Sequence, residues 1–435
     1  MSFDSSSFWL FVLALWCVCQ LIRYNGARKL LLLAASYFVY SSFFPAKSKM
    51  AYIMLLAGVT AGSFIVGRLV ETGRRRALFL AGIWIMAGGL AAAKGWLSPL
   101  PVGLSFYVLQ AIAWMVDSYR SAKPGKDPFL DFALYMSFFP RLTAGPIVRA
   151  DEFLPQLTKR PFIDSAALWE GLALIVFGLF KKLALADNLG LVVDPIFADL
   201  HDATPSRILL ATYGFTAQIY CDFSGYSDMA LGTARLFGYR LPENFNWPYL
   251  ARNPADFWRR WHISLSNWLR DYVYFSLPGH RSKSRVPTYL NLMVTMAVCG
   301  LWHGFGWSYL AWGVYHGVLL AAYYRKRADS VLLMQQLAVM GWILFRANRV
   351  SDLAIYFASL FRGPFFTGFL PNEWIAVGIL CAVAMFHALE TQVPVFKSML
   401  AHRWNPWTCT VLLLLTLATA ALTLPNQQMF LYFRF

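Results

Sequence analysis

The stretch FWRRWHISLSNWLRDYVY, residues 257–274, and the short sequence LWHG, residues 301–304, decide how this chain is interpreted. The first stretch has an apolar, tryptophan-rich face at helical spacing, and arginines and small polar residues take most of its other side. This pattern is typical of a helix that lies in the plane of a membrane surface. Asn253 can cap such a helix, Pro254 fits its first position, and Pro278 ends it. The two stretches together indicate chemistry at a bilayer boundary.

The composition of the whole chain indicates a membrane protein. Of 435 residues, 58% are hydrophobic and only 14% are charged, a balance that soluble domains do not show. Apolar runs suited to crossing a bilayer recur along the chain. We predict spans at residues 8–22, 30–44, 50–70, 77–93, 168–185, 208–236, 289–301, 307–324, 331–344, 374–389 and 407–424.

Two further apolar pieces complete the predicted fold. Residues 102–116 are expected to form a short span, and residues 129–139 a re-entrant or tightly buried segment. The polar stretches are too short to fold alone, so we expect a single integral-membrane domain over residues 1–435. The predicted fold class is an all-α polytopic membrane protein with about 11–12 transmembrane helices plus re-entrant and interfacial helices.

A net charge of +16 invites a nucleic-acid interpretation, but the positions of the charges argue against one. Lysines and arginines lie between the apolar runs, as the positive-inside rule requires. The basic clusters that we place on the cytoplasmic side are Arg23, Arg28 and Lys29, residues 74–76, and Arg120, Lys123 and Lys126. We expect membrane lipid, and no nucleic acid, as the partner of these loops.

Several common kinds of site are missing from the sequence. The six cysteines are scattered without CxxC or zinc spacing, so neither disulfides nor a metal site is expected. There is no Walker loop, no GxGxxG and no HExxH. The N-terminus has no convincing cleavable signal, so the first span is expected to stay in the mature protein.

Two histidines are the candidate catalytic residues. His303 lies at the end of an apolar run, with Gly300 and Gly304 one helical turn apart for close packing of a neighbouring helix. An ionisable residue there indicates a functional role, and the alternative is a neutral histidine that bonds across helices. His262 lies among the arginines and tryptophans of the first stretch, where it can orient a substrate, act as a second base or simply mark the water boundary. Their neighbours Trp302 and Trp261 are candidate pocket residues.

Three charged residues in apolar surroundings are further pocket candidates. Asp222 and Asp228 lie six residues apart and do not share a helix face, so we expect them to anchor arginines or hold the pocket open. A proton relay is the other possibility for the two carboxylates. Arg141 lies in a segment with Pro140, Gly145 and Pro146 that suits a bent, cavity-lining piece or an ordinary surface loop.

These residues fall in motifs that resemble the membrane-bound O-acyltransferases, and among them the bacterial alginate O-acetyltransferase branch. The motifs are PVGLSFYVLQAIAWMVDSYR (101–120), SFFPRLTAGPIVR (137–149), YCDFSGYSDMALGTARLFGYRLPENFNWPY (220–249), FWRRWHISLSNWLRDYVY (257–274), CGLWHG (299–304), GWILFRA (341–347) and FLYFRF (430–435). The likeness runs almost end to end. Arg141 stands where the family is expected to have Gln, and Cys299 where a small residue is usual.

The resemblance implies roles, a fold and substrates. His303 matches the family's catalytic histidine in W-H-G, and His262 its second histidine in R-W-H-x-S. His303 is then the general base for acetyl transfer from a cytoplasmic donor, acetyl-CoA, towards an exopolysaccharide outside a bacterial inner membrane. No tightly bound cofactor is implied. The family fold is a ring of helices around a thin centre with two funnels, and a periplasmic SGNH-type partner with a Ser-His-Asp site is expected to complete the transfer.

Other functions remain open at the level of sequence. Within the family, D-alanyl transfer to teichoic acid and acetylation of peptidoglycan or cellulose are alternatives. A transporter or flippase would use the buried Asp and His residues as a relay, but the chain shows no internal repeat. A pure scaffold for polymer secretion would leave the two histidines without a role.

Overall fold

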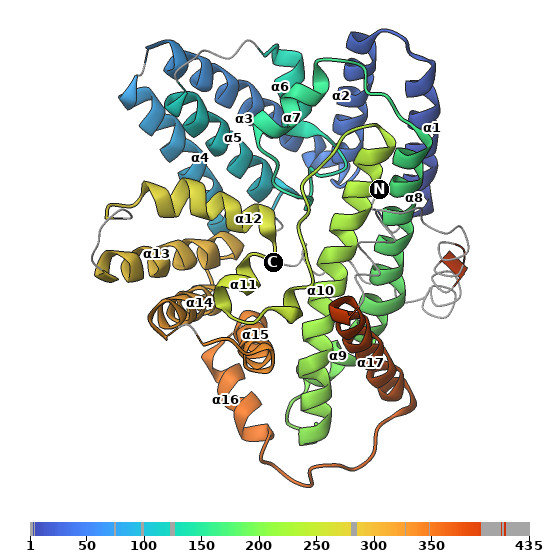
Figure 1. The fold of residues 1–435 in the computed structure, drawn as a ribbon, viewed down its shortest axis with the longest axis vertical. Coiled ribbons are helices and arrows are strands. Elements are labelled where there is room, and N and C mark those ends of the chain that lie inside the picture. The colour runs from blue at the N-terminus through green and yellow to red at the C-terminus, as the bar shows by residue number, and fades with distance from the viewer. Residues whose placement is uncertain are drawn as a thin grey trace. The chain divides into compact units, whose positions relative to one another are not determined.

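The structure, a computed structural model, describes residues 3, 5–73, 75–96, 100–121, 127–279, 285–326, 328–347, 349–392, 410 and 413–414. Throughout this part of the chain the secondary structure is helical, with no strand (Figure 1), which confirms the all-α class. Several predictions fall outside the described residues: most of the span at 407–424, the motif at 430–435, and the basic residues Arg74, Lys123 and Lys126.

The chain divides into two compact units, and each is described separately. The first unit contains residues 1–175 and 226–243, and the second contains residues 176–225 and 244–435. The prediction of a single integral-membrane domain stays a prediction.

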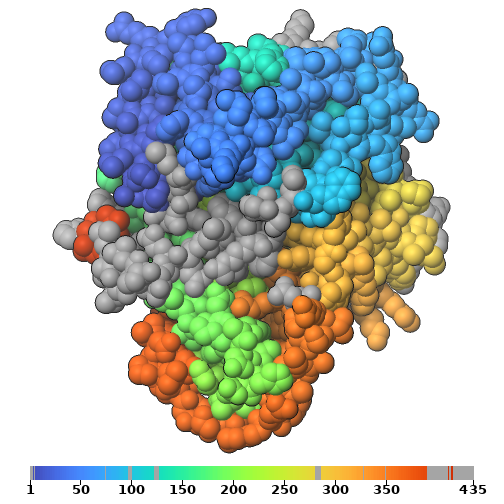
Figure 2. Space-filling view, turned by 180° about the vertical axis from the view of Figure 1, so that it is seen from behind, coloured from blue at the N-terminus to red at the C-terminus, as the bar shows by residue number. Residues whose placement is uncertain are grey.

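The first unit is built around helix α5, which is buried along nearly its whole length. Its helices are α1(Ser6–Leu21), α2(Asn25–Ser41), α3(Ala46–Gly73), α4(Arg76–Trp96), α5(Leu104–Arg120), α6(Phe129–Ser137), α7(Ala150–Leu157), most of α8(Ser165–Leu179) and the end of α10(Pro205–Leu236). Helices α3 and α4 both pack on α5. Figure 2 shows the blue residues of α1 to α4 together on one face. Apolar side chains on all sides of α5 suit a helix that is enclosed by other helices.

Helix α6 covers most of residues 129–139. Its residues from Asp131 to Ser137 are all buried, although Phe129 is 48% exposed, and a re-entrant course stays a prediction. The chain then runs without a regular helix from residue 138 to residue 149. Pro140 and Pro146 remove backbone donors in this segment, which prevents a continuous helix.

The second unit holds both candidate histidines. Its elements are the π-helix η1(Phe180–Ala186), α9(Asp187–Ala198), the first part of α10, the 3₁₀-helix η2(Pro248–Leu250), α11(Pro254–Trp258), α12(Ile263–Trp268), the π-helix η3(Leu269–Val273), the 3₁₀-helix η4(Tyr274–Ser276), α13(Arg285–His303), α14(Trp307–Lys326), α15(Val331–Arg346), α16(Val350–Ser359) and α17(Pro371–Gln392).

Helices α13 and α14 pack closely, as the glycine spacing predicted. A Cβ atom added at Gly300 would collide with the carbonyl oxygen of Tyr309, and one added at Gly313 would collide with that of Met296. Glycines at both contact points therefore let the two backbones approach. Helix α13 ends at His303, about one turn beyond Gly300.

Three described helices are long and apolar enough to cross a membrane: Ala46–Gly73, Arg76–Trp96 and Pro371–Ala388. Most of the other predicted spans coincide with helices that are shorter or more polar. Helices α9 and α16 were not predicted as separate elements. The full number of crossings stays a prediction.

The prediction of one continuous helix over residues 257–274 is wrong, and its in-plane position stays a prediction. The chain forms α11, a turn, α12, η3 and η4 in succession, and it breaks at His262, whose φ of 42° is left-handed. The tryptophans of the apolar face are buried within the unit, and the ring centroid of Trp261 lies 4.6 Å from that of Trp342. Packing against neighbouring helices, which the local pattern does not encode, replaced a regular helix by short pieces.

Candidate active site

His303 is the last residue of α13 and lies in an aromatic enclosure. Its side chain is 9% exposed. Ring centroids of Trp302, Trp312 and Phe345 lie 4.8, 5.3 and 5.2 Å from that of His303. Trp312 belongs to α14 and Phe345 to α15, so three helices meet around this imidazole. The three rings and the end of α13 surround the imidazole.

His262 lies in the turn between α11 and α12 and is almost fully buried. Its ring lies 4.8 Å from that of Phe223 on α10 and 6.1 Å from that of Trp302. Trp302 therefore lies beside both histidines. A left-handed φ in a residue other than glycine is strained, and such strain concentrates at functional sites.

Asn244 fixes the protonation of His262, and the sequence analysis missed it. The Oδ1 atom of Asn244 accepts from the backbone N–H of Ser264 at 3.3 Å and from its hydroxyl at 2.8 Å. Because this oxygen is an acceptor, the Nδ1 atom of His262, 3.1 Å away, must donate to it. The neutral tautomer then carries its lone pair on Nε2. Burial lowers the pKa of His262 to about 3, which keeps the ring neutral.

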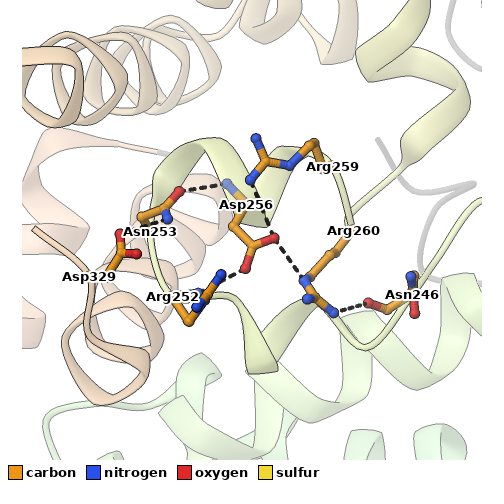
Figure 3. Close-up of polar contacts among 7 residues, drawn as sticks. All are labelled: Asn246, Arg252, Asn253, Asp256, Arg259, Arg260 and Asp329. Atoms are coloured by element: carbon orange, nitrogen blue, oxygen red, sulfur yellow. Dashed lines mark hydrogen bonds and ion pairs between the residues drawn. The ribbon is translucent and has the colours of Figure 1, made fainter. Parts of the chain in front are cut away.

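A polar network on one side of the turn holds its backbone (Figure 3). The carboxylate of Asp256 accepts from the Nε of Arg260 at 3.0 Å and from the backbone N–H of Arg252 at 3.1 Å. Arg260 also donates to the carbonyl of Asn246 at 3.2 Å, and its own carbonyl accepts from the Asn246 N–H at 2.9 Å. Burial alone would raise the pKa of Asp256, but these bonds hold it below its ordinary value.

The predicted cap of the segment is confirmed. Asn253 accepts from the backbone N–H of Asp256 at 2.8 Å and donates to Asp329 at 2.9 Å, and Pro254 takes the first turn of α11. The cap and the Asp256 network together define how the chain enters the turn at His262.

Trp261 lies in a cluster of rings behind His262. Its ring centroid is 4.6 Å from that of Trp342 and 5.0 Å from that of Phe245. His316 of α14 belongs to the same cluster through Trp312, at 4.9 Å, and is buried. The structure therefore brings Trp261, Trp302, His262 and His303 into one aromatic region of the second unit.

Asp222 accepts from the Nζ of Lys182 at 2.8 Å, and Lys182 also contacts Asp187 at 2.8 Å. All three side chains are buried. It is Phe223, the neighbour of Asp222, whose ring contacts His262.

Asp228 and Arg141 belong to the first unit. Asp228 is half-buried on α10. Arg141 is 1% exposed, and its guanidinium lies over the rings of Tyr135, at 5.0 Å, and Phe153, at 5.3 Å. The surface-loop alternative for Arg141 is therefore wrong, because the segment is buried.

A cavity of about 520 Å³ lies in the second unit, between the ends of α9, α15 and α16. Tyr309 and Arg346 are in its wall. The ring of Tyr309 is 5.2 Å from that of Phe345, which also contacts His303. No group of three or more His, Cys, Asp or Glu residues in the described part of the chain could hold a metal ion.

The described residues are helical and apolar, with two buried histidines beside one tryptophan, which is consistent with a membrane protein. A family model for MBOAT, the membrane-bound O-acyltransferase family, matches residues 94–348. This range includes every candidate site residue named above. The chain belongs to this family, and it is therefore a membrane-bound acyltransferase.

Individual relatives extend the similarity beyond the family model. "Probable alginate O-acetylase AlgI" of Azotobacter vinelandii is 41% identical over 60% of this chain and 54% of its own length. The protein of the same name from Pseudomonas aeruginosa is 36% identical over 81% of this chain and 73% of its own length. "Peptidoglycan O-acetyltransferase" of Helicobacter pylori is 35% identical over 58% of this chain and 55% of its own length.

Proposed function

We propose that this chain is an O-acetyltransferase that moves an acetyl group from cytoplasmic acetyl-CoA towards a polysaccharide outside the membrane, and that the polysaccharide is alginate. The observation that carries the proposal is the similarity to the alginate O-acetylases over most of the chain. The buried pair of His303 and His262 supplies the acid–base chemistry that O-acetyl transfer needs.

The proposed reaction is a transfer from sulfur to oxygen. His303 accepts the proton of the attacking hydroxyl, the hydroxyl oxygen forms a bond to the acetyl carbon, and the thioester bond to CoA breaks. The proton held by His303 then passes to the leaving thiolate. A neutral imidazole suits this role near physiological pH. His262, whose tautomer Asn244 fixes, orients the substrate or acts as a second base.

The setting of the reaction is part of the same proposal. The chain would lie in a bacterial inner membrane as a multi-pass protein, with a ring of helices, a thin centre and two funnels. The cavity beside Tyr309 and Arg346 would admit one of the substrates, because Tyr309 in its wall contacts the Phe345 ring next to His303. A periplasmic SGNH-type partner would complete the transfer to the polymer.

A second acceptor deserves a test because one relative is named for it. The Helicobacter pylori protein is a peptidoglycan O-acetyltransferase by name and is 35% identical to this chain. Both acceptors are carbohydrate hydroxyls, so the same histidines would serve either. D-alanyl transfer from a carrier protein and acetylation of cellulose are the remaining outcomes.

The experiment uses a strain that lacks the gene, complemented with the full chain. We expect acetyl esters to return on the exopolysaccharide and not on isolated peptidoglycan, measured by ester hydrolysis and chromatography. Membranes given acetyl-CoA labelled in its acetyl group should incorporate the label, and labelled D-alanyl carrier protein should give none. Esters on peptidoglycan alone, or incorporation of D-alanine alone, would overturn the proposal.

A further inference from the structure

Two consecutive lysines on the π-helix η1 hold two residues of helix α10. Lys182 contacts the carboxylate of Asp222 at 2.8 Å and that of Asp187 at 2.8 Å. Lys181 donates to the hydroxyl of Ser224 at 3.0 Å. Both lysines are buried, as are all three of their partners. Buried charges within apolar helices are costly, so an arrangement of this kind points to a function.

The two held residues lie on opposite flanks of α10. Successive residues of an α-helix are about 100° apart around the axis, so Asp222 and Ser224 are separated by about 200°. Gly225 falls on the face between these flanks. A Cβ atom added at Gly225 would come within 2.8 Å of the carbonyl oxygen of Gly178 and within 3.3 Å of the backbone nitrogen of Lys182. The η1 segment therefore packs on the Gly225 face, and its lysines reach around both sides of α10.

The side chain of Phe223 projects from α10 on the side opposite Gly225. It lies between Asp222 and Ser224 in sequence and about 160–200° from Gly225 around the axis. Its ring meets the imidazole of His262 edge to face, with centroids 4.8 Å apart and planes at 84°. A rotation of α10 about its own axis would carry this ring away from His262.

We propose that Lys181 and Lys182 are positioning residues: they fix the rotation of α10 and so hold Phe223 against His262. Replacing buried ion pairs by packed apolar residues often costs no stability, so stability alone does not require charges here. Hydrogen bonds have direction, and two of them on opposite flanks fix a rotation that apolar packing would leave loose. The π-helical turn places adjacent lysines for this contact, in line with the occurrence of π-turns at functional sites. The inference rests on the proposed function only through the role of His262.

The first test is a double-mutant cycle in the full chain. Lys182→Met should lower kcat about tenfold with little change in KM, and Phe223→Leu should lower it similarly, within the range of coupling found for connected residues. The double variant should be no worse than the poorer single variant. Lys182→Arg should restore most of the activity. Ser224→Ala, which removes one hydroxyl and no charge, serves if Lys182→Met fails to accumulate.

The matched control is Arg207→Met. Arg207 also lies on α10 and forms an ion pair with Glu373 at 2.6 Å, but it is four turns away from Phe223 along the helix. We expect unchanged kcat in this variant at equal membrane level. Multiplicative losses from Lys182→Met and Phe223→Leu, or an equal loss in Arg207→Met, would overturn the proposal.

The second test needs no activity. Cysteines placed by Phe223→Cys and His262→Cys, in a chain whose native cysteines are replaced, should be joined efficiently by a short bifunctional thiol cross-linker, because the two native rings are in contact. Adding Ser224→Ala or Lys182→Met should reduce the yield several-fold, and adding Arg207→Met should leave it unchanged. An unchanged yield with both Ser224→Ala and Lys182→Met would overturn the positioning role. If the chain transferred no acetyl group at all, the cross-linking result would still stand, so the two proposals can fail separately.

Discussion

Two buried, irregular segments of this chain handle polar side chains in opposite ways. In the segment from residue 244 to residue 264, His262 is held by Asn244, and Arg260 by Asp256 and Asn246. In the segment from residue 138 to residue 149, Arg141 is buried between the rings of Tyr135 and Phe153. None of the three guanidinium nitrogens of Arg141 has a hydrogen-bond partner among the described residues.

The two segments differ in whether their polar side chains are held in one orientation. Hydrogen bonds fix the direction of a ring and its tautomer, which a proton-transfer site requires. Ring faces attract a cation but leave its orientation loose. We propose that the first segment orients groups for the reaction and that the second serves packing. Substitutions in the first should act mainly on activity, and the substitution of Arg141 should act weakly on both activity and stability.

The largest effect is expected from His303→Ala. Removing a general base costs about 10²–10⁴-fold in rate, so acetyl esters on the polymer should fall below detection. The variant should still accumulate, because His303 ends α13 rather than filling its middle. Acetyl content in a complemented deletion strain, at matched membrane level, is the measurement. Near-normal acetylation would remove His303 from the mechanism.

Asn244 offers the sharpest test of the ordered segment. Asn244→Leu would leave the Ser264 donors and the Nδ1–H of His262 buried without an acceptor, at a cost of about 1–3 kcal/mol for each unsatisfied group. We expect activity to fall by about tenfold or more, together with lower stability. Asn244→Asp keeps an acceptor in place and should retain more activity than Asn244→Leu. Equal activities of the two variants would show that the tautomer does not matter.

The two arginines of the turn should respond unequally to charge reversal. The side chain of Arg260 is 29% exposed and bonds both Asp256 and the carbonyl of Asn246, whereas that of Arg259 is 67% exposed and lies 3.5 Å from Asp256. Exposed ion pairs contribute about 0–1 kcal/mol. Arg260→Glu should therefore lower activity clearly, and Arg259→Glu only slightly, in the same acetylation assay. Similar losses of activity in both variants would mean that activity depends on the surface charge and not on the bonds that hold the turn.

Acid should destabilise the protein partly through His262. Its pKa is about 3 in the folded protein and near the ordinary 6.5 in the unfolded chain. As the pH falls, His262 is therefore protonated in the unfolded chain before it is protonated in the folded protein. Its contribution to the free energy of unfolding is complete above pH 6.5 and is lost as pH falls towards 3. As the pH is lowered from 7.5 to 4.5, the unfolding temperature should fall less steeply in His262→Gln than in the unchanged chain. Parallel pH profiles would contradict the buried, neutral state.

The sequence predicts the fold better than it predicts the site. Most of the predicted spans correspond to helices, because apolar runs and their ends are local signals. The break at His262 and the π-helix η1 were not predicted, since both follow from packing between distant segments. The contact of Asp222 with Lys182 was not predicted for the same reason: Lys182 lies 40 positions away, and nothing local pairs the two. Asn244 could have been noticed as a polar residue within the motif of residues 220–249.

The smallest effect is expected from Arg141→Gln, with Arg28→Gln as its matched control in the same unit. Arg28 is also 1% exposed, but it donates to the carbonyl of Phe237 at 2.7 Å. Losing that charge-assisted bond should cost about 1.5–3 kcal/mol, seen as a lower unfolding temperature in detergent. Arg141→Gln loses only ring contacts of about 0.5–2 kcal/mol and removes the desolvation cost of a buried cation, so the two changes nearly cancel. Activity of this variant should stay within about threefold of the unchanged chain, because no bond that orients a side chain is lost. A large loss of activity at unchanged unfolding temperature would contradict this and would assign Arg141 to the binding of an anionic group.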